Sequence, residues 1–155
     1  MIDIKLSDKR SREYLDKFND FFVAVSMCDK RETRMVDDKR CRYSVKHSKL
    51  ALVESIYDFT IYFGSAGLDS ICLTLVEDNN GKFIKTKIEA RCFDPRKPIN
   101  RDELLKLVFE SGIDKENMKT QFTDAGINKV ELSLNEDVVF TDVLQSLYEG
   151  MIRGY

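Results

Sequence analysis

The clearest alternation of hydrophobic and polar residues lies between Ile71 and Cys92, on both sides of a short turn. The first run reads Ile-Cys-Leu-Thr-Leu-Val-Glu, the second reads Lys-Phe-Ile-Lys-Thr-Lys-Ile-Glu-Ala-Arg-Cys, and the turn between them ends in Asn80-Gly81. Asn and Gly adopt positive φ angles at low cost, so this pair is typical of tight hairpin turns. The pattern therefore predicts a β-hairpin.

The length of the hairpin loop decides which side chains share a face. A two-residue loop places Leu75 opposite Thr86, and a four-residue loop places it opposite Ile84. Both loops give the same apolar face, whereas a three-residue loop would set Leu75 opposite Lys85 and mix the two faces. We therefore exclude the three-residue loop and expect an apolar face made of Ile71, Leu73, Leu75, Ile84, Ile88, Ala90 and Cys92.

Hydrophobic residues recur at steps of three and four from Ser7 to about Val25, which predicts an amphipathic helix. Either Ser7 or Ser11 is expected to cap its first turn. An aromatic stripe at this spacing usually packs in a core; the alternative is a partner-binding face that includes Phe18 and Phe22. The stripe contains Tyr14, Phe18, Phe21, Phe22 and Val25.

The next part of the chain gives a mixed pattern. Residues 29–42 are mostly charged, so we interpret them as a charged surface segment. Cys41, Tyr43 and Val45 alternate with polar residues and indicate a short strand. We expect a helix over about 48–55 and a strand over 57–63, which together with the hairpin would make a three-stranded meander over about 57–93.

The C-terminal third contains two further helical patterns and one clear strand. A middle helix is predicted over about 101–111, capped by Asn100 and ended by Gly112, with a buried stripe of Leu104, Leu105, Val108 and Phe109. Alternation at about 129–134 predicts a strand, which residues 119–122 are expected to join. A last helix is predicted over about 137–152, with an apolar stripe of Val139, Phe140, Val143, Leu144, Leu147, Tyr148 and Met151.

This order of elements predicts a single α+β domain, residues 1–155, in which an antiparallel sheet packs against N-terminal, middle and C-terminal helices. Across about residues 57–152, the order resembles that of small type III secretion chaperones and related YbjN-like domains. The resemblance implies a fold and no functional residue, because no specific motif carries it. The charged segment at 29–42 departs from that pattern.

Composition and charge narrow the function classes. The chain has 155 residues and a net charge of −2, so no overall field favours nucleic acid or an anionic membrane. The charge is uneven: residues 1–50 carry a net +4, residues 51–155 a net −6, and residues 102–149 hold 4 basic against 11 acidic side chains. Four cysteines without a C-x-x-C spacing suggest reduced thiols and a cytoplasmic protein. No apolar run is long enough to span a membrane.

The sequence contains few residues of the kinds that usually act in catalysis, metal binding or phosphate binding. There is one histidine, His47, in a charged context, and the paired acids are sequence neighbours that diverge on a helix or strand. Gly64-Ser-Ala-Gly67 precedes a predicted strand and not a helix, so it is not expected to cradle phosphate. We therefore predict no catalytic residue, no metal site and no cofactor.

The remaining candidates are surface residues. The outer face of the hairpin presents a row of cations beside one aromatic side chain, and the 29–42 segment adds further cations. An ordinary solvated sheet face is the simplest interpretation of this row; a partner-binding surface is the functional one. The candidate partner-binding residues are Lys82, Phe83, Lys85, Lys87, Arg91, Arg31, Arg34, Arg40, Phe18 and Phe22.

Three functional hypotheses follow from these observations. The first is a non-enzymatic protein-binding accessory module, such as an inhibitor, immunity factor, adaptor or chaperone, that acts through surface complementarity. The alternative is a nucleic-acid-associated regulator that uses the cations of the hairpin and of residues 30–42 on phosphates. An enzyme of unrecognised type is a third hypothesis. A homodimer is also expected if the apolar stripes of the first and last helices exceed what one sheet face can cover.

Overall fold

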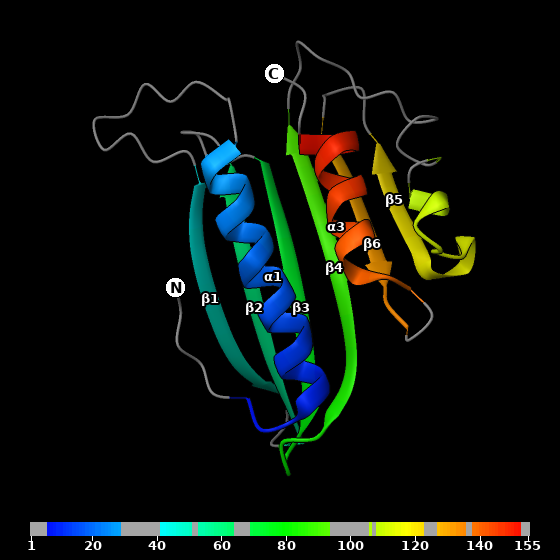
Figure 1. Cartoon of the computed structure of the whole chain (residues 1–155). Coiled ribbons are helices and arrows are strands. Elements are labelled where there is room, and N and C mark those ends of the chain that lie inside the picture. Colours follow the sequence, from blue (N-terminus) through cyan, green and yellow to red (C-terminus); the bar gives the residue numbers. More distant parts are fainter. Residues whose placement is uncertain are drawn as a thin grey trace.

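The computed structural model describes residues 6–28, 41–50, 53–63, 69–93, 106, 108–122, 127–135 and 138–152. The chain folds as a single α+β domain built on one six-stranded antiparallel sheet of order β1-β2-β3-β4-β6-β5 (Figure 1). The elements are α1 (Lys9–Cys28), β1 (Cys41–Leu50), β2 (Glu54–Phe63), β3 (Asp69–Asp78), β4 (Phe83–Phe93), the 3-10 turn η1 (Lys115–Asn117), β5 (Met118–Phe122), β6 (Ile127–Ser133), α3 (Phe140–Leu147) and the π-helical turn η2 (Tyr148–Ile152).

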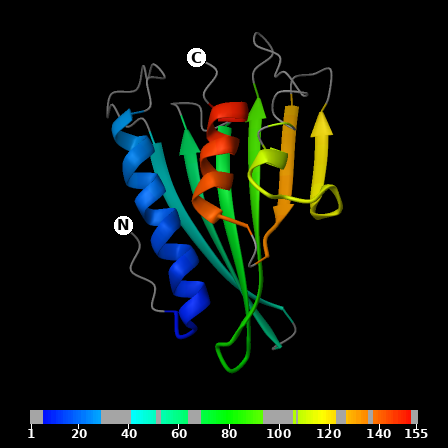
Figure 2. The same cartoon turned by 45° about the vertical axis from the view of Figure 1, so that its right-hand side comes forward.

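Both long helices lie on the same face of the sheet (Figures 1 and 2). We call this the helix-covered face, and the opposite one the open face, because no described element packs on it. The core lies between the helices and the sheet and contains fully buried side chains from both layers. These include Phe18 of α1, Leu144 and Leu147 of α3, and Phe59, Ile61, Ile71, Leu73, Leu75, Ile88, Val130 and Leu132 of the sheet.

The meander has four strands where the sequence predicted three. The strand predicted at Cys41, Tyr43 and Val45 is confirmed and continues to Leu50, and β2 begins at Glu54. The helix predicted over 48–55 is therefore wrong. Ten consecutive residue pairs join β1 to β2, including Ser48 with Ile56, so strand pairing prevails over the helix-like spacing of a few apolar residues.

The β3–β4 hairpin is confirmed, but its loop is the one that the sequence argument excluded. The backbone N–H of Asp78 donates to the carbonyl of Lys82 at 2.8 Å, which leaves three residues in the loop. Gly81 occupies the left-handed region at φ 77°, as three-residue hairpin loops require. The register nevertheless matches the two-residue prediction, because Leu75 pairs with Thr86 and Leu73 with Ile88.

A β-bulge reconciles the loop with the register. Val76 pairs with Lys85 and Glu77 with Phe83, so Ile84 is an extra residue on β4. The bulge restores the alternation from Thr86 onward, and Ile71, Leu73, Leu75, Ile88 and Ala90 are all fully buried as predicted. Ile84 was predicted on the apolar face but does not lie there, and 43% of its surface is exposed. The side chain of Cys92 lies outside the described residues.

The first turn of α1 is capped by Asp8 and not by Ser7 or Ser11. One carboxylate oxygen of Asp8 accepts the backbone N–H of Arg10 at 2.8 Å, and the other accepts the backbone N–H of Phe83 at 2.9 Å. The hydroxyl of Ser7 donates to the carbonyl of Gly81 at 3.1 Å. The start of the helix is therefore hydrogen-bonded to the end of the hairpin. Near the middle of α1, the hydroxyl of Tyr43 donates to Asn19 Oδ1 at 2.6 Å and joins β1 to α1.

The C-terminal third follows the predicted order with three corrections. Residues 106 and 108–110 are helical, and Gly112 ends this segment at φ 93°, as predicted. Val108 is buried, but Phe109 is 41% exposed because it lies about 100° around the helix from Val108. The last helix begins at Phe140 and not near 137, and Val139 before it is exposed. Strands β5 and β6 pair as expected, while Asn100, Leu104, Leu105 and Met151 fall outside the described side chains.

Candidate functional site

The predicted cations of the hairpin lie on or beside the open face, but carboxylates separate them. Lys87 Nζ lies 3.3 Å from Glu131 Oε1, and Arg91 Nη2 lies 3.5 Å from Glu89 Oε1. Glu89 Oε2 also lies 3.5 Å from Lys129 Nζ. Lys82 and Lys85 are exposed near the hairpin end. The row is thus a mixed-charge surface, which lowers its attraction for a phosphate backbone compared with an unbroken row of cations.

Phe83 does not accompany these cations, which corrects the sequence interpretation. The bulge at Ile84 shifts the alternation by one residue, so Phe83 faces α1 on the helix-covered side. Its ring stacks on Tyr14 with centroids 5.9 Å apart, and the guanidinium carbon of Arg10 lies 4.5 Å from its centroid. Phe83 therefore belongs to the contact between the hairpin and α1.

The aromatic stripe of α1 is confirmed as core. Phe18 is fully buried and meets Tyr43 edge-on at 6.0 Å, so its side chain has no surface to offer a partner. Phe22 is half-buried and meets the same tyrosine ring at 4.9 Å. The remaining predicted site residues, Arg31, Arg34 and Arg40, lie outside the described residues.

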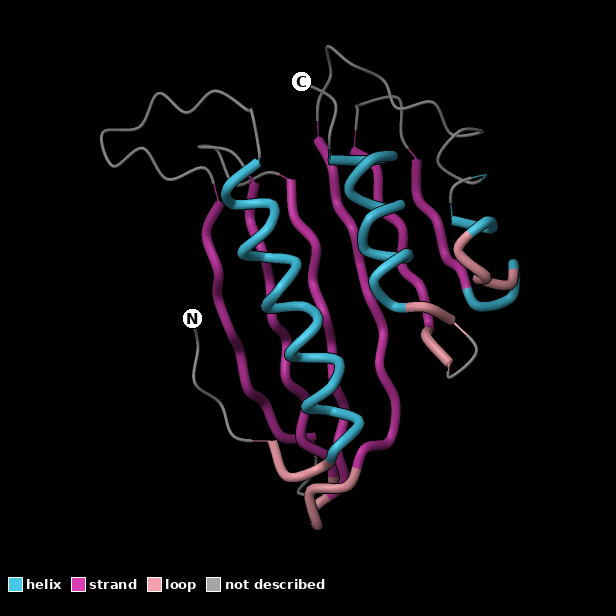
Figure 3. The backbone as a smooth tube through the Cα atoms, viewed as in Figure 1, coloured by secondary structure: helices cyan, strands magenta, loops and turns pink. Residues whose placement is uncertain are grey.

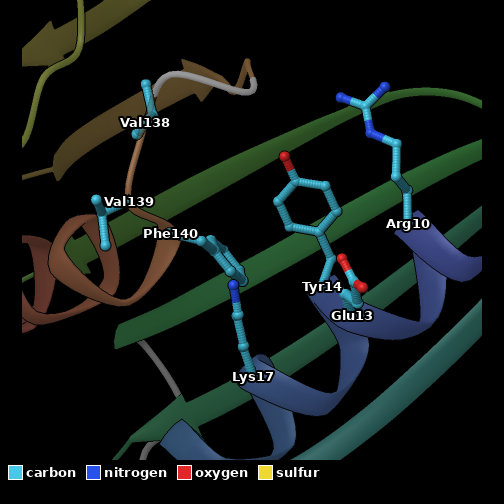
Figure 4. A pocket seen from close by; sticks show the side chains of 7 residues that line it. All are labelled: Arg10, Glu13, Tyr14, Lys17, Val138, Val139 and Phe140. Carbon is cyan, nitrogen blue, oxygen red and sulfur yellow. The ribbon is translucent and has the colours of Figure 1, made fainter.

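A groove that the sequence did not predict lies between α1 and the start of α3 (Figure 4). We call it the α1–α3 groove; its volume is about 430 Å³. Tyr14 and Phe140 form its aromatic part, with ring centroids 5.1 Å apart in an edge-to-face arrangement. The groove is lined by Arg10, Glu13, Tyr14 and Lys17 of α1 and by Val138, Val139 and Phe140 of the segment that leads into α3.

Among the described lining residues, the charged side chains lie on one side of this groove. Arg10 and Lys17 bring positive charge from α1, while the opposite side is formed by valine and phenylalanine. Glu13 is the single carboxylate among the described lining residues, and its Oε1 lies 3.9 Å from Lys9 Nζ outside the groove. Figure 4 shows the Tyr14 ring between Arg10 and Phe140, with the amine of Lys17 directed toward Phe140. An apolar surface therefore adjoins a net positive one.

Val139, one of the groove residues, is an unusual choice for the N-cap position of α3. It is the N-cap of α3, with φ −80° and ψ 106°, and it makes no side-chain capping hydrogen bond. Valine is among the weakest N-cap residues, and replacement of a good cap by an apolar residue typically costs about 1 kcal/mol. The side chain is also 54% exposed, so it gains little from burial. Val139 also lines the α1–α3 groove.

The described ionisable groups give no reactive cluster. Burial raises the pKa of the Cys72 thiol; hydrogen bonds to Thr60 and Thr74 oppose this effect, and the nearby carboxylates of Asp58 and Glu89 add to it. The thiol is therefore protonated at neutral pH, which is the unreactive form. His47 is exposed and stacks on Tyr57 with centroids 4.3 Å apart. Among the described residues, no three His, Cys, Asp or Glu side chains lie close enough together to hold a metal ion.

None of the helices in the described part of the chain is long and apolar enough to cross a membrane. Comparisons of the chain with protein-family models, with curated protein sequences and with solved structures gave no match. The resemblance to type III secretion chaperones therefore rests on the order of elements alone. Evidence for function has to come from the surfaces described above.

Proposed function

We propose that this protein is a protein-binding module that holds a segment of another protein in the α1–α3 groove. The segment would carry an apolar anchor residue with acidic residues beside it. The observation that carries the proposal is the pairing of an apolar surface, made by Tyr14, Val138 and Val139 over the buried Phe140, with the cations Arg10 and Lys17 on the α1 side. An inhibitor, immunity factor, adaptor or chaperone would all act through such a site.

The apolar part of the groove would supply most of the binding free energy. Tyr14 is half-buried and Val139 is exposed, so an anchor side chain would remove both from water. Aromatic residues are enriched at such contacts because they offer a large rigid surface at low entropic cost. The two cations would orient the bound segment and speed its association. Charges at the rim of an interface act mainly on the association rate and on the alignment of the two partners.

The N-cap of α3 supports the same proposal independently. A serine, threonine or aspartate at position 139 would stabilise the helix by about 1 kcal/mol. Sites that bind ligands commonly sacrifice stability in this way, because a residue suited to binding stands where another would suit the fold better. Val139 in the α1–α3 groove fits that description.

The proposal can be tested with a displayed library of random peptides selected on the purified protein. We expect the selected peptides to combine a large apolar residue with Asp or Glu. Their affinity should fall about tenfold in Val139→Ser and in Lys17→Glu, which corresponds to about 1.4 kcal/mol each. The matched controls Val53→Ser and Lys106→Glu alter an exposed valine and an exposed lysine outside the groove and should leave affinity unchanged.

Stability measurements separate binding from folding in this test. Val139→Ser should raise the free energy of unfolding while it weakens peptide binding, so loss of binding cannot be attributed to a damaged fold. Selected peptides that bind wild type and Val139→Ser equally, or a library that gives no binder, would overturn the proposal.

A further inference from the structure

We propose that the edge strand β1 is a second binding site, separate from the α1–α3 groove, which takes an extended acidic segment of another protein by strand addition. β1 pairs with β2 through ten consecutive residue pairs without a bulge and is the last strand of the sheet on its side. Ten extended residues are about 33 Å long. No described residue pairs with its outer edge (Figure 3), which leaves a row of backbone N–H and C=O groups for another strand.

The two edges of the sheet are protected differently. The opposite edge strand, β5, has five residues, and short edge strands offer little for another chain to pair with. β1 has twice that length and contains neither proline nor a bulge. Its remaining protection is charge, because it carries Arg42, Lys46 and Lys49 and no Asp or Glu.

The positive charge of β1 determines which kind of strand can pair with its outer edge. If two copies of β1 paired antiparallel with Arg42 of each opposite Lys46 of the other, cations would face cations across the new ladder, which is destabilising. An acidic strand would instead place carboxylates opposite the same side chains. The charge of β1 therefore opposes self-association and favours a partner segment rich in Asp or Glu.

The two faces of β1 define the sequence pattern of that segment. Arg42 and Lys46 lie on the open face, where the guanidinium carbon of Arg42 lies 5.5 Å from the ring centroid of Tyr62. Tyr43 and Val45 are half-buried on the helix-covered face, where Phe22 contacts the tyrosine ring. Strand addition matches side chains of one face with neighbours on that face. The segment should therefore alternate acidic residues, toward the open face, with apolar ones.

A capped ten-residue peptide of alternating glutamate and valine is a suitable probe. We expect it to slow hydrogen exchange of the β1 backbone amides, as followed by NMR. A peptide with lysine in place of glutamate should not do so. The same Glu-Val sequence with every backbone amide methylated should not bind either, because it cannot donate hydrogen bonds to the edge.

Charge reversal of the strand provides the protein-side test. Arg42→Glu with Lys46→Glu, which reverses the two open-face cations of β1, should weaken the Glu-Val peptide at least about tenfold and allow the lysine peptide to bind. Lys106→Glu with Lys115→Glu changes net charge equally at exposed positions outside β1 and should have no effect. Val139→Ser should also have no effect, which distinguishes this site from the groove.

Three results would overturn the proposal. They are equal binding of the methylated peptide, no protection of the β1 amides by the Glu-Val peptide, and a wild-type dimer that pairs through β1.

Discussion

At the scale of single residues, Asp8 shows how one side chain can join two elements. Its carboxylate caps α1 through the N–H of Arg10 and accepts the N–H of Phe83 from the hairpin. The bond from Phe83 is the main reason that the pKa of Asp8 is lowered; burial opposes it, and the N–H groups of Arg10 and Ser11 and the charge of Arg10 add to it. The charged carboxylate is therefore the form that the folded protein stabilises.

Removal of this carboxylate should have a pH-dependent effect. Because the folded pKa lies below the unfolded value of about 3.9, the stabilisation is present above that value and is lost as the pH falls through the folded pKa. Asp8→Ala should lower the free energy of unfolding by about 2 kcal/mol at neutral pH, from a lost cap and a lost hydrogen bond. In urea titrations, the difference from wild type should shrink below about pH 4.

The two isoleucines of β4 provide a second test at this scale. Ile88 is fully buried, whereas Ile84 at the bulge is 43% exposed. Ile88→Ala should lower the free energy of unfolding by about 3 kcal/mol, and Ile84→Ala by less than about 1 kcal/mol. Urea denaturation of the two variants measures the contrast. Similar losses would show that Ile84 is buried in solution and that the bulge is absent.

At the scale of elements, periodic patterns predicted the long segments correctly. The predictions of the α1 stripe, the hairpin alternation and the strand near 129–134 each rest on several apolar positions that fit the same period. The cap of α1 could not be predicted, because the choice of Asp8 over Ser7 depends on Phe83, 75 positions away in the chain. The helix expected over 48–55 failed for a related reason, since pairing with β1 decides its structure.

The contact between α1 and the hairpin predicts different costs at two glycines. Gly81 and Gly112 both have positive φ, at 77° and 93°. A Cβ at Gly81 would collide with Ser7 Oγ, whereas a Cβ at Gly112 would meet nothing within 4 Å. Gly112→Ala should therefore cost about 1 kcal/mol from backbone strain alone, and Gly81→Ala about 2 kcal/mol.

A double-mutant cycle isolates the contribution of the contact. In a Ser7→Ala background the hydroxyl is gone, so the cost of Gly81→Ala should fall to that of Gly112→Ala. Thermal or urea unfolding of the four proteins gives the coupling free energy. A coupling near zero would mean that Ser7 does not rest on the hairpin loop.

At the scale of the whole molecule, the candidate site was the part that sequence reasoning missed. The α1–α3 groove brings residues 10–17 together with residues 138–140. A local pattern of hydrophobic and polar residues cannot predict a contact between segments so far apart in the sequence. The apolar residue Val139 just before the last helix could have indicated the groove, but its position fits the apolar stripe of that helix equally well. The predicted cations of the hairpin lie on or beside the open face as expected. Glu131, which pairs with Lys87, and Lys129, which pairs with Glu89, come from a strand that the sequence did not connect to the hairpin.

The packing of the helix stripes bears on the homodimer that the sequence suggested. The sequence suggested a homodimer because the helix stripes looked wider than one sheet face, but Phe18, Leu144 and Leu147 are fully buried against the sheet. In the described part of the chain the outer edge of β1 is unpaired, and we expect Lys46 and Lys49 to oppose its pairing with a second copy. Lys46→Thr with Lys49→Thr keeps strand propensity and removes this repulsion, so we expect the variant to dimerise in sedimentation velocity experiments while wild type stays monomeric. The same double substitution at Lys106 and Lys115 should leave a monomer, and a monomeric β1 variant would mean that charge is not what keeps this edge unpaired.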